Sequence, residues 1–272
     1  KKNNLLNWNE SIKKLHGTDD AKNVKSRSYR RLVFDEICAN FLALSENRKR
    51  IKKEKNPKIF KTSISSRILK ELPFKLTKSQ ESVINEINLD LKNPRRMFRI
   101  LQGDVGSGKT IVSFLTIANV LENNYQCALM SPTEILSLQH FHLAQKIFEK
   151  INIRIEFLTG KTSYSKRKEI LKDLAEGKIN FLIGTHSLFQ KKIKFKNLGY
   201  VIIDEQHKFG VKQRSDLAKK GGKNCDLLLM SATPIPRTMM MSLYGDMDIS
   251  KINEKPSTRK TILTLSKPEK KI

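Results

Sequence analysis

The stretch "MFRILQGDVGSGKT", residues 97–110, decides the fold of this chain. Residues 97–102 have the length and apolar composition of a buried strand, and a helical pattern begins near Lys109. Between them, Gly103–Thr110 has the spacing of a loop that cradles phosphate: Gly, four residues, Gly, Lys and then Thr. Glycines let backbone N–H groups curl around an anion, and the new helix directs its positive end at it. The stretch therefore predicts a phosphate-binding loop between a strand and a helix.

Each residue of this loop has an expected task. We expect Lys109 to reach the β- and γ-phosphates of a nucleoside triphosphate, and the Thr110 hydroxyl to ligate Mg²⁺. The other loop residues expected to bind the nucleotide are Gly103, Gly106, Ser107 and Gly108. The alternative is an ordinary glycine-rich turn, which the strand before the loop and the helix after it disfavour.

Short apolar stretches alternate with helical patterns along the rest of the chain from about residue 77. The expected strands are residues 97–102, 126–131, 153–159, 179–185, 200–205 and 226–233, with helices starting near Lys109, Glu134, Ser165, Gly210 and Ile235. This alternation predicts an α/β fold with a mostly parallel sheet flanked by helices. Right-handed crossovers place the carboxyl ends of all parallel strands at one edge, where ligands of such folds bind. We therefore expect the chemistry at that edge.

A pair of carboxylates ends one of these strands. In "LGYVIIDEQHKFGVKQR", residues 198–214, an apolar run stops at Asp204 and Glu205. We expect Asp204 to hold Mg²⁺ through water, and Glu205 to orient and deprotonate the attacking water. Adjacent acids on a strand point to opposite faces, which favours separate roles. The alternative is that both acids only cap the helix that follows.

Two weaker motifs lie on either side. In "MSATPIPRT", Ser231 and Thr233 end a strand beside the acids, where they could hydrogen-bond them and respond to the γ-phosphate; capping is the alternative. In "LPFKLTKSQESVINEI", Phe74 and Gln80 precede the phosphate-binding loop. A glutamine amide can pair with both the donor and the acceptor on the edge of adenine, which favours ATP. The alternative for Gln80 is a surface position.

The first sixty residues follow another pattern. Residues 27–55 carry an apolar stripe at helical spacing, which predicts one long amphipathic helix before Pro57, whereas residues 1–26 are weakly patterned and expected to be partly irregular. The members of the stripe are Leu32, Ile37, Phe41 and Leu44. The basic cluster "RKRIKKEKNPKIFK", residues 48–61, is either a solvated helix end or a patch that tracks phosphates.

Composition limits the possible functions. The 272 residues include 53 Lys and Arg against 27 Asp and Glu, a net charge of +26 that would attract a polyanion such as nucleic acid. A generally lysine-rich composition is the alternative. Cys38, Cys127 and Cys225 form no CxxC pair, so neither a disulfide framework nor a zinc site is indicated. No apolar run approaches the roughly 20 residues of a membrane span and no secretory signal is present, so we expect a cytoplasmic protein.

The motifs together resemble the first motor lobe of a superfamily 2 helicase. "LPFKLTKSQ", "LQGDVGSGKT", "SPTEILSLQHF", "GTHSLFQ", "IIDEQHKFGVKQR" and "SATPIPRTMMMSLYGDMDIS" closely resemble the RecG family, which remodels branched DNA. The resemblance covers about residues 27–262, and its "DEQH" box is specific. The transcription-repair coupling translocase, which acts on double-stranded DNA, is the alternative family: it shares "ATPIPRT" but typically has a second acid where this chain has Gln206.

The resemblance implies a RecA-like P-loop NTPase lobe that uses ATP and Mg²⁺ and acts on branched duplex DNA. It implies that Lys109, Thr110, Asp204 and Glu205 are catalytic, and that Gln206 and His207 couple the nucleotide state to DNA. A hydrogen bond within the turn after the strand is the alternative for His207. Thr133, Glu134 and Thr185 lie in segments that contact the DNA backbone in such motors.

The resemblance also divides the chain. Residues 1–60 would be a helical linker from a wedge domain, residues 61–256 the first helicase lobe, and residues 257–272 the start of the connection to a second lobe. Because the second lobe supplies arginine fingers worth roughly 10³ or more in rate, we expect this chain alone to bind ATP weakly and hydrolyse it slowly or not at all. A DNA-binding lobe without useful ATPase activity, and an NTPase unconnected to DNA, are the alternatives.

Overall fold

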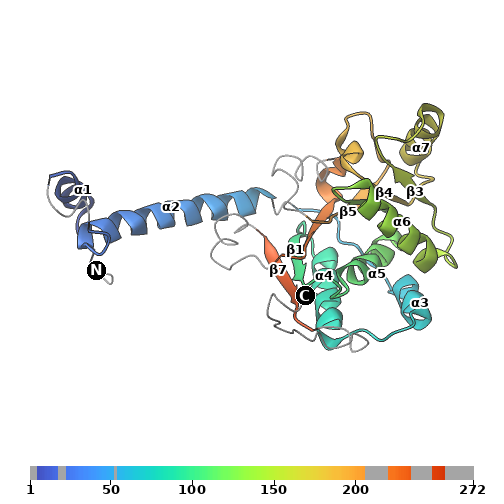
Figure 1. Ribbon diagram of the computed structural model, residues 1–272, viewed down its shortest axis with the longest axis horizontal. Helices are drawn as coiled ribbons and strands as arrows, with labels where there is room; N and C mark the ends of the chain where they lie inside the picture. Colours follow the sequence, from blue (N-terminus) through green and yellow to red (C-terminus); the bar gives the residue numbers. More distant parts are fainter. Residues whose placement is uncertain (1–4, 18–22, 52–53, 206–219, 234–246, 255–272) are drawn as a thin grey trace, which may run out of the picture. The chain divides into compact units, whose positions relative to one another are not determined.

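The computed structural model describes residues 5–17, 23–51, 54–205, 220–233 and 247–254 (Figure 1). These residues fall into two parts, an N-terminal part that ends at Ile51 and a larger part that begins at Glu54. The helices expected near Gly210 and Ile235 lie outside the described residues.

The N-terminal part consists of two helices in contact with each other, α1 (Trp8–Gly17) and α2 (Arg27–Ile51). The expected long helix is confirmed as α2. The weak patterning of residues 1–26 gave no indication of α1, whose first turn is fixed by Asn7: its side chain accepts a hydrogen bond from the backbone of Asn9. On α2, members of the apolar stripe are exposed in this structure, with Ile37 48% and Phe41 46% accessible.

The larger part is built on one sheet of seven parallel strands in the order β3-β4-β2-β5-β6-β1-β7. The strands are β1 (Phe98–Gly103), β2 (Gln126–Met130), β3 (Ile155–Leu158), β4 (Phe181–Gly184), β5 (Leu198–Ile203), β6 (Asp226–Ser231) and β7 (Asp248–Ile252). The six expected strands and the parallel sheet are confirmed. The sequence analysis missed β7, an edge strand whose "DISKI" buries only alternate residues, Ser250 and Ile252.

Helices cover this sheet. They are α3 (Ser63–Glu71), α4 (Lys78–Lys92), α5 (Lys109–Leu121), α6 (Glu134–Phe148) and α7 (Tyr164–Glu176), with short 3₁₀ turns η2 (His186–Phe189) and η4 (Gly222–Asn224). The helices expected near Lys109, Glu134 and Ser165 are therefore confirmed, with a shift of one residue for α7. From Val112 onward every residue of α5 is buried, because this helix packs against α3, α4 and three strands.

The main core lies on one face of the sheet. Tyr200 and Ile202 of β5 join the side chains of α3, α4, α5 and α6 in a single apolar cluster, whereas their neighbour Val201 is buried but lies outside that cluster. This alternation is the two-residue period of a strand that is covered on both faces. Phe114 is central to the cluster, with its ring centroid 6.1 Å from those of Phe148 and Phe181.

The basic cluster at residues 48–61 was expected to be either a solvated helix end or a patch that tracks phosphates. Two lysines in its second half are neither. Lys55 and Lys58 are buried, and their ammonium groups lie 2.7 and 2.6 Å from a carboxylate oxygen of Asp226 at the start of β6. Burial lowers the pKa of Lys55, and the charge of Asp226 opposes that shift. Asp226 also accepts a hydrogen bond of 2.6 Å from the backbone of Met97. These two lysines therefore attach the segment before α3 to the amino edge of the sheet.

Candidate functional site

The expected motifs meet at the carboxyl edge of the sheet. Strands β5, β6 and β1 are consecutive neighbours, so the acids after β5, Ser231 at the end of β6 and the loop after β1 lie side by side. The register pairs Gln102 of β1 with Ser231. On the other side of β5, the backbone of Asp204 donates a hydrogen bond of 2.8 Å to the carbonyl of Met130 in β2. Segments that are a hundred residues apart in sequence thus form one site.

The loop between β1 and α5 has the backbone that a phosphate cradle requires. Gly106 and Gly108 have φ angles of 77° and 89°, in the left-handed region that glycine adopts without a steric penalty. A Cβ atom at Gly108 would also lie 2.3 Å from Nε2 of Gln80. Gly103 ends β1 and Ser107 is buried within the loop. The loop therefore has the backbone conformation that the sequence indicated, and its binding of phosphate stays a prediction.

Lys109 begins α5 and reaches back across its own loop. Its Nζ donates hydrogen bonds to the carbonyl oxygens of Gly103, at 2.8 Å, and Asp104, at 3.0 Å. Burial lowers the pKa of Lys109, while the negative charges of Asp204, Glu205 and Asp104 act in the opposite direction. The ammonium group therefore lies within the electrostatic influence of both acids, and its contact with phosphate stays a prediction.

Gln80 is buried rather than on the surface, with 2% of its area accessible. It forms a capping box at the start of α4, in which its Oε1 accepts from the backbone of Thr77 at 2.9 Å and its backbone donates to the Thr77 hydroxyl. Its Nε2 donates to the carbonyl of Ser107 at 2.8 Å. In this structure Gln80 thus supports the phosphate-binding loop, and its contact with adenine stays a prediction.

The two acids follow β5 instead of belonging to it, because the strand ends at Ile203 and not at residue 205 as expected. Asp204 is 9% exposed, and its Oδ1 accepts a hydrogen bond from the backbone of Glu205 at 3.0 Å. Glu205 has a φ of 49°, a left-handed conformation that costs a non-glycine residue on the order of 1–3 kcal/mol. Such strain is typical of functional sites. The expected alternation of the two side chains along a strand does not apply, because both acids lie beyond the last residue of β5.

Ser231 and Thr233 lie next to each other at the end of β6, with their hydroxyl oxygens 3.1 Å apart. The amide of Gln102 donates to the carbonyl of Thr233 at 3.3 Å. Their expected hydrogen bonds to the acids stay a prediction. Gln206 and His207, the expected coupling residues, lie outside the described residues.

The expected DNA-contacting residues also follow neighbouring strands, β2 and β4. Thr133 caps α6, since its side chain accepts a hydrogen bond from the backbone of Leu136 at 3.3 Å. Glu134 forms an ion pair of 2.9 Å with Lys161, and that hydrogen bond lowers the pKa of Glu134. Thr185 comes directly after β4 and is 9% exposed. The structure thus brings these residues to the same edge of the sheet as the acids.

The sequence analysis missed His140, which contacts one of the acids. Its Nε2 lies 2.8 Å from Oδ2 of Asp204, and both residues are buried. The spacing of Thr133, Ser137 and His140 on α6 was the available signal, because residues four and three apart share one helix face. No local pattern could identify the partner of His140, because Asp204 lies 64 residues away in sequence.

Two properties of this edge of the sheet are suitable for binding a nucleotide and a metal ion. Ser107 Oγ, Gln102 Oε1 and Ser131 Oγ are buried without a hydrogen-bond partner among the described residues, and they end or follow β1 and β2. Buried polar atoms normally have partners, so such a group of atoms indicates a ligand or ordered water. The second property is chemical, because a lysine, a threonine hydroxyl and a carboxylate are suitable groups for phosphate and Mg²⁺.

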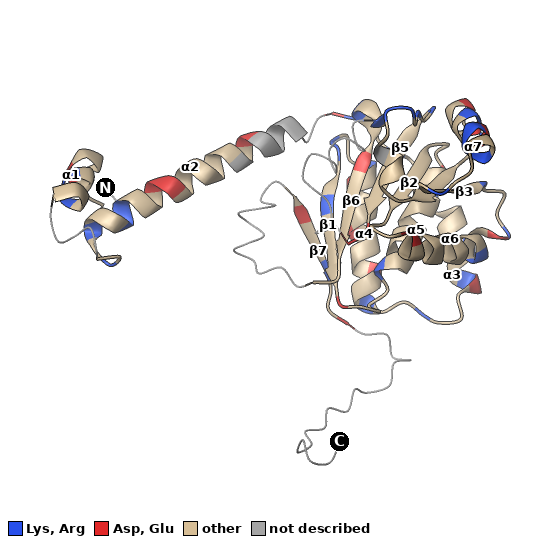
Figure 2. Cartoon of the chain, turned by 45° about the horizontal axis from the view of Figure 1, so that its top comes forward, with Lys and Arg blue, Asp and Glu red and all other residues tan. Residues whose placement is uncertain are grey.

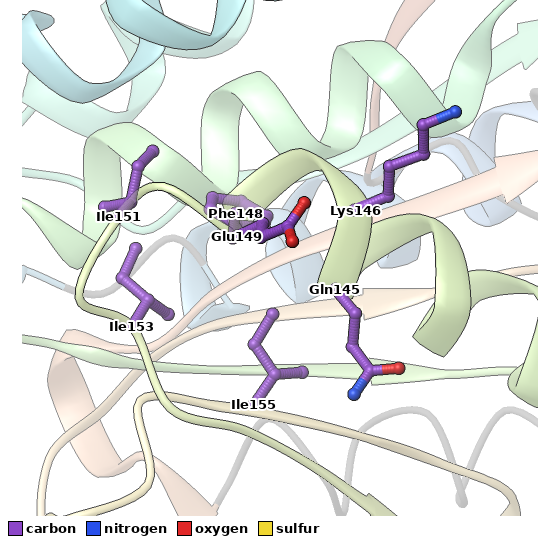
Figure 3. A pocket seen from close by; sticks show the side chains of 7 residues that line it. All are labelled: Gln145, Lys146, Phe148, Glu149, Ile151, Ile153 and Ile155. Atoms are coloured by element: carbon purple, nitrogen blue, oxygen red, sulfur yellow. The ribbon is translucent and has the colours of Figure 1, made fainter.

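Two open grooves lie elsewhere on the larger part, and one of them contains Phe74, whose expected contact with the nucleotide stays a prediction. Phe74 lines one, of about 840 Å³, with residues from the end of α3 and the start of α4. The other, of about 500 Å³, lies at the carboxyl end of α6 and the start of β3, where Ile151, Ile153 and Ile155 form an apolar wall (Figure 3). Neither groove contains a residue of the phosphate-binding loop or the acid pair, so volume alone does not locate the site.

Comparison with known families defines the class of protein. The model of the DEAD/DEAH box helicase family matches residues 77–242, and the chain therefore belongs to that family. Within it, the chain is similar to proteins named ATP-dependent DNA helicase RecG: it is 46% identical to that of Aquifex aeolicus over 93% of this chain and 33% of that protein. The corresponding protein of Thermotoga maritima is 45% identical over 88% of this chain and 30% of that protein. The resemblance to RecG is confirmed, and the chain spans about a third of the length of these relatives.

Solved structures agree. A structure of RecG bound to a three-way DNA junction has a TM-score of 0.78 and 41% identity, over 87% of this chain and 32% of that chain. The DEAD-box helicase Mss116 bound to ssRNA has a TM-score of 0.57 at 20% identity, over 71% of this chain and 44% of that chain, which shows the fold alone. The expected RecA-like lobe is therefore confirmed. Among the helices that the structure describes, none has the length and apolar character to cross a membrane.

Proposed function

We propose that this chain is the ATP-binding motor lobe of a DNA helicase that acts on branched DNA, such as replication forks and Holliday junctions, in recombination and repair. One observation carries the proposal: the phosphate-binding loop and the Asp204–Glu205 pair lie at one sheet edge, beside the segments after β2 and β4 that are expected to contact DNA. ATP is the proposed cofactor, with Mg²⁺.

The residues of this edge have distinct roles in the proposal. The backbone of the loop and the Lys109 ammonium group hold the phosphates, and Thr110 and Asp204 are the residues that would hold Mg²⁺. When bound, the metal ion neutralises charge that develops on the phosphate oxygens. Glu205 orients the attacking water and accepts its proton. Its left-handed backbone supports this role, because strained conformations cluster at functional sites.

The proposed contacts with DNA rest on placement and charge. Thr133, Glu134 and Thr185 follow β2 and β4 at the carboxyl edge, where we place the contact with nucleic acid. Basic side chains occur on α7 and on several loops of the larger part (Figure 2), which would add an attraction that depends on salt. Gln206, His207, Ser231 and Thr233 are proposed to couple the nucleotide state to these contacts.

The proposed division of the chain is a linker up to residue 60, a first lobe over residues 61–256 and the start of a further connection over residues 257–272. A second helicase lobe and a wedge domain of the same protein are the proposed partners, along with branched duplex DNA. The relatives support this division, because the chain covers only about a third of their length. On this proposal, the full ATPase site requires groups from the second lobe.

The test is steady-state ATP hydrolysis by this chain with Mg²⁺, with and without a branched DNA, beside the variant Glu205→Gln. Nucleotide binding without turnover supports a lobe that needs its partner. DNA-stimulated turnover that Glu205→Gln removes supports the catalytic assignment and contradicts the need for a second lobe. Failure to bind nucleotide, or hydrolysis that neither DNA nor Glu205→Gln changes, would overturn the proposal.

A further inference from the structure

We propose that His140 is a positioning residue that fixes the metal-holding carboxylate of Asp204 and ties it to the helix that begins at the expected DNA contact. The inference rests on the proposed function, which places Asp204 at the metal ion and Thr133 at DNA. It gives a role to His140, which lies within the motif "SPTEILSLQHF" and to which the sequence analysis assigned none.

The contact between the two side chains is short and shielded. His140 Nε2 lies 2.8 Å from Asp204 Oδ2, with the side chains 10% and 12% exposed. A carboxylate is an acceptor, so we assign the proton of this hydrogen bond to Nε2. The other oxygen, Oδ1, accepts from the backbone of Glu205 at 3.0 Å. With both oxygens engaged, rotation of the carboxylate would break a hydrogen bond in a site that water reaches poorly.

The imidazole ring of His140 also packs against an aromatic ring. The Phe114 ring of α5 meets it edge-on, with the ring centroids 6.5 Å apart and the planes at 72°. Phe114 lies on the same helix that begins with Lys109 and Thr110. His140 therefore lies between the helix that carries the phosphate-binding lysine and the carboxylate that follows β5.

One face of α6 connects this contact to the expected DNA side. Thr133 caps the helix, Ser137 Oγ donates to the carbonyl of Gly184 at 3.1 Å, and His140 contacts Asp204. Gly184 directly precedes Thr185, so α6 contacts the ends of both β4 and β5. From Thr133 to His140 the helix rises about 10 Å, at roughly 1.5 Å per residue. A displacement at the start of α6 is thus passed to Asp204 through a rigid helix and one hydrogen bond.

The substitution His140→Phe separates the hydrogen bond from packing, because phenylalanine keeps a ring against Phe114 and lacks the donor. Substitutions of such partners of metal-binding groups typically reduce metal affinity by about 10- to 100-fold. His140→Gln provides the matched rescue, since the amide nitrogen of glutamine can donate from a position similar to that of imidazole Nε2. Ser137→Ala is the control for α6, because it removes the contact to Gly184 and leaves that to Asp204.

The first experiment measures the affinity of this chain for Mn²⁺ in the presence of the non-hydrolysable analogue AMP-PNP, by the loss of the free-ion EPR signal. We expect His140→Phe to weaken Mn²⁺ binding about tenfold or more, His140→Gln to restore most of the loss, and Ser137→Ala to have no effect. The thermal midpoint of each variant is measured in parallel. Unchanged Mn²⁺ affinity in His140→Phe, or an equal loss in a stably folded His140→Gln, would overturn the positioning role.

The second experiment measures the affinity for a branched DNA with and without Mg²⁺ and AMP-PNP. If the two sites are coupled, Mg²⁺ and AMP-PNP change the affinity of the unsubstituted chain for DNA by some factor. We expect this factor to be closer to one in His140→Phe. A ratio that His140→Phe leaves unchanged would overturn the link through α6. If the unsubstituted chain shows no DNA binding, the DNA part of the proposed function fails, while the Mn²⁺ measurement still decides the positioning of Asp204.

Discussion

The side-chain nitrogen of Gln80 donates a hydrogen bond to the carbonyl oxygen of Ser107 at 2.8 Å, so the start of α4 supports the phosphate-binding loop. The amide oxygen of the same side chain accepts from Thr77. The buried side chain of Gln80 therefore holds both the first turn of α4 and the carbonyl of Ser107. The next residue, Gly108, has a left-handed backbone and directly precedes α5.

Substitution of Gln80 by alanine should weaken nucleotide binding. Loss of a buried hydrogen bond with an unsatisfied carbonyl left behind costs about 1–2 kcal/mol, which corresponds to roughly tenfold in dissociation constant. Titration with a fluorescent ATP analogue measures the effect. Thr77→Ala is the matched control, because it removes the cap and leaves the contact to Ser107. Equal affinity of Gln80→Ala and the unsubstituted chain would show that the loop does not depend on this support.

Substitution of Lys109 by alanine should separate the two activities proposed for the full-length protein. ATP hydrolysis should be abolished, because the ammonium group that holds the phosphates is gone. Binding to branched DNA and its dependence on salt concentration should stay mostly intact, since the proposed DNA contacts follow β2 and β4. Binding assays at several salt concentrations check this expectation. A parallel loss of DNA binding would contradict the separation of the two surfaces.

Substitution of Asp226 by asparagine should destabilise the larger part by about 3–5 kcal/mol, because it leaves two buried ammonium groups without their counter-ion. Chemical denaturation measures the free energy of unfolding. The control is Lys150→Ala, which removes an exposed ion pair of 3.3 Å with Glu71 and should cost less than about 1 kcal/mol. Similar effects of the two substitutions would mean that the buried cluster contributes no more than a surface pair.

Stability should fall in acid partly through Glu122. Burial alone would raise the pKa of this carboxyl, but hydrogen bonds from Ser63, Thr62 and Lys61 outweigh it and lower the pKa. A lowered pKa in the folded state contributes stability above the ordinary value of about 4.3, and this contribution is lost as the pH falls through the folded-state pKa. Glu122→Gln should therefore lose stability at neutral pH and show a weaker decline below about pH 4.3. Unfolding measured from pH 7 to pH 3 decides; identical pH profiles would contradict this role.

The sequence was sufficient for those features that local pattern determines. The loop at Gly103–Thr110 and the apolar run before Asp204 were recognisable because their chemistry requires particular residues at fixed spacings. Parallel strands buried on both faces are nearly continuous apolar runs, which explains why six strands were predicted. The edge strand β7 lacks such a run, since it exposes Lys251 between Ser250 and Ile252.

The remaining features depend on contacts between distant parts of the chain. Lys58 and Asp226 are 168 residues apart, and a basic run gives no indication of which lysine is buried. His140 and Asp204 likewise come together only when α6 packs beside the ends of β4 and β5. The left-handed backbone of Glu205 also follows from tertiary structure, because glutamate has no local preference for it.

The buried lysines attach the segment before α3 to a strand that reaches both edges of the sheet. Lys55 and Lys58 form ion pairs with Asp226, the first residue of β6. The last residue of the same strand is Ser231, at the carboxyl edge of the sheet. The segment that begins at Glu54 is therefore attached to the amino end of β6, which lies between β5 and β1, and the opposite end of this strand lies at the edge that holds the acid pair.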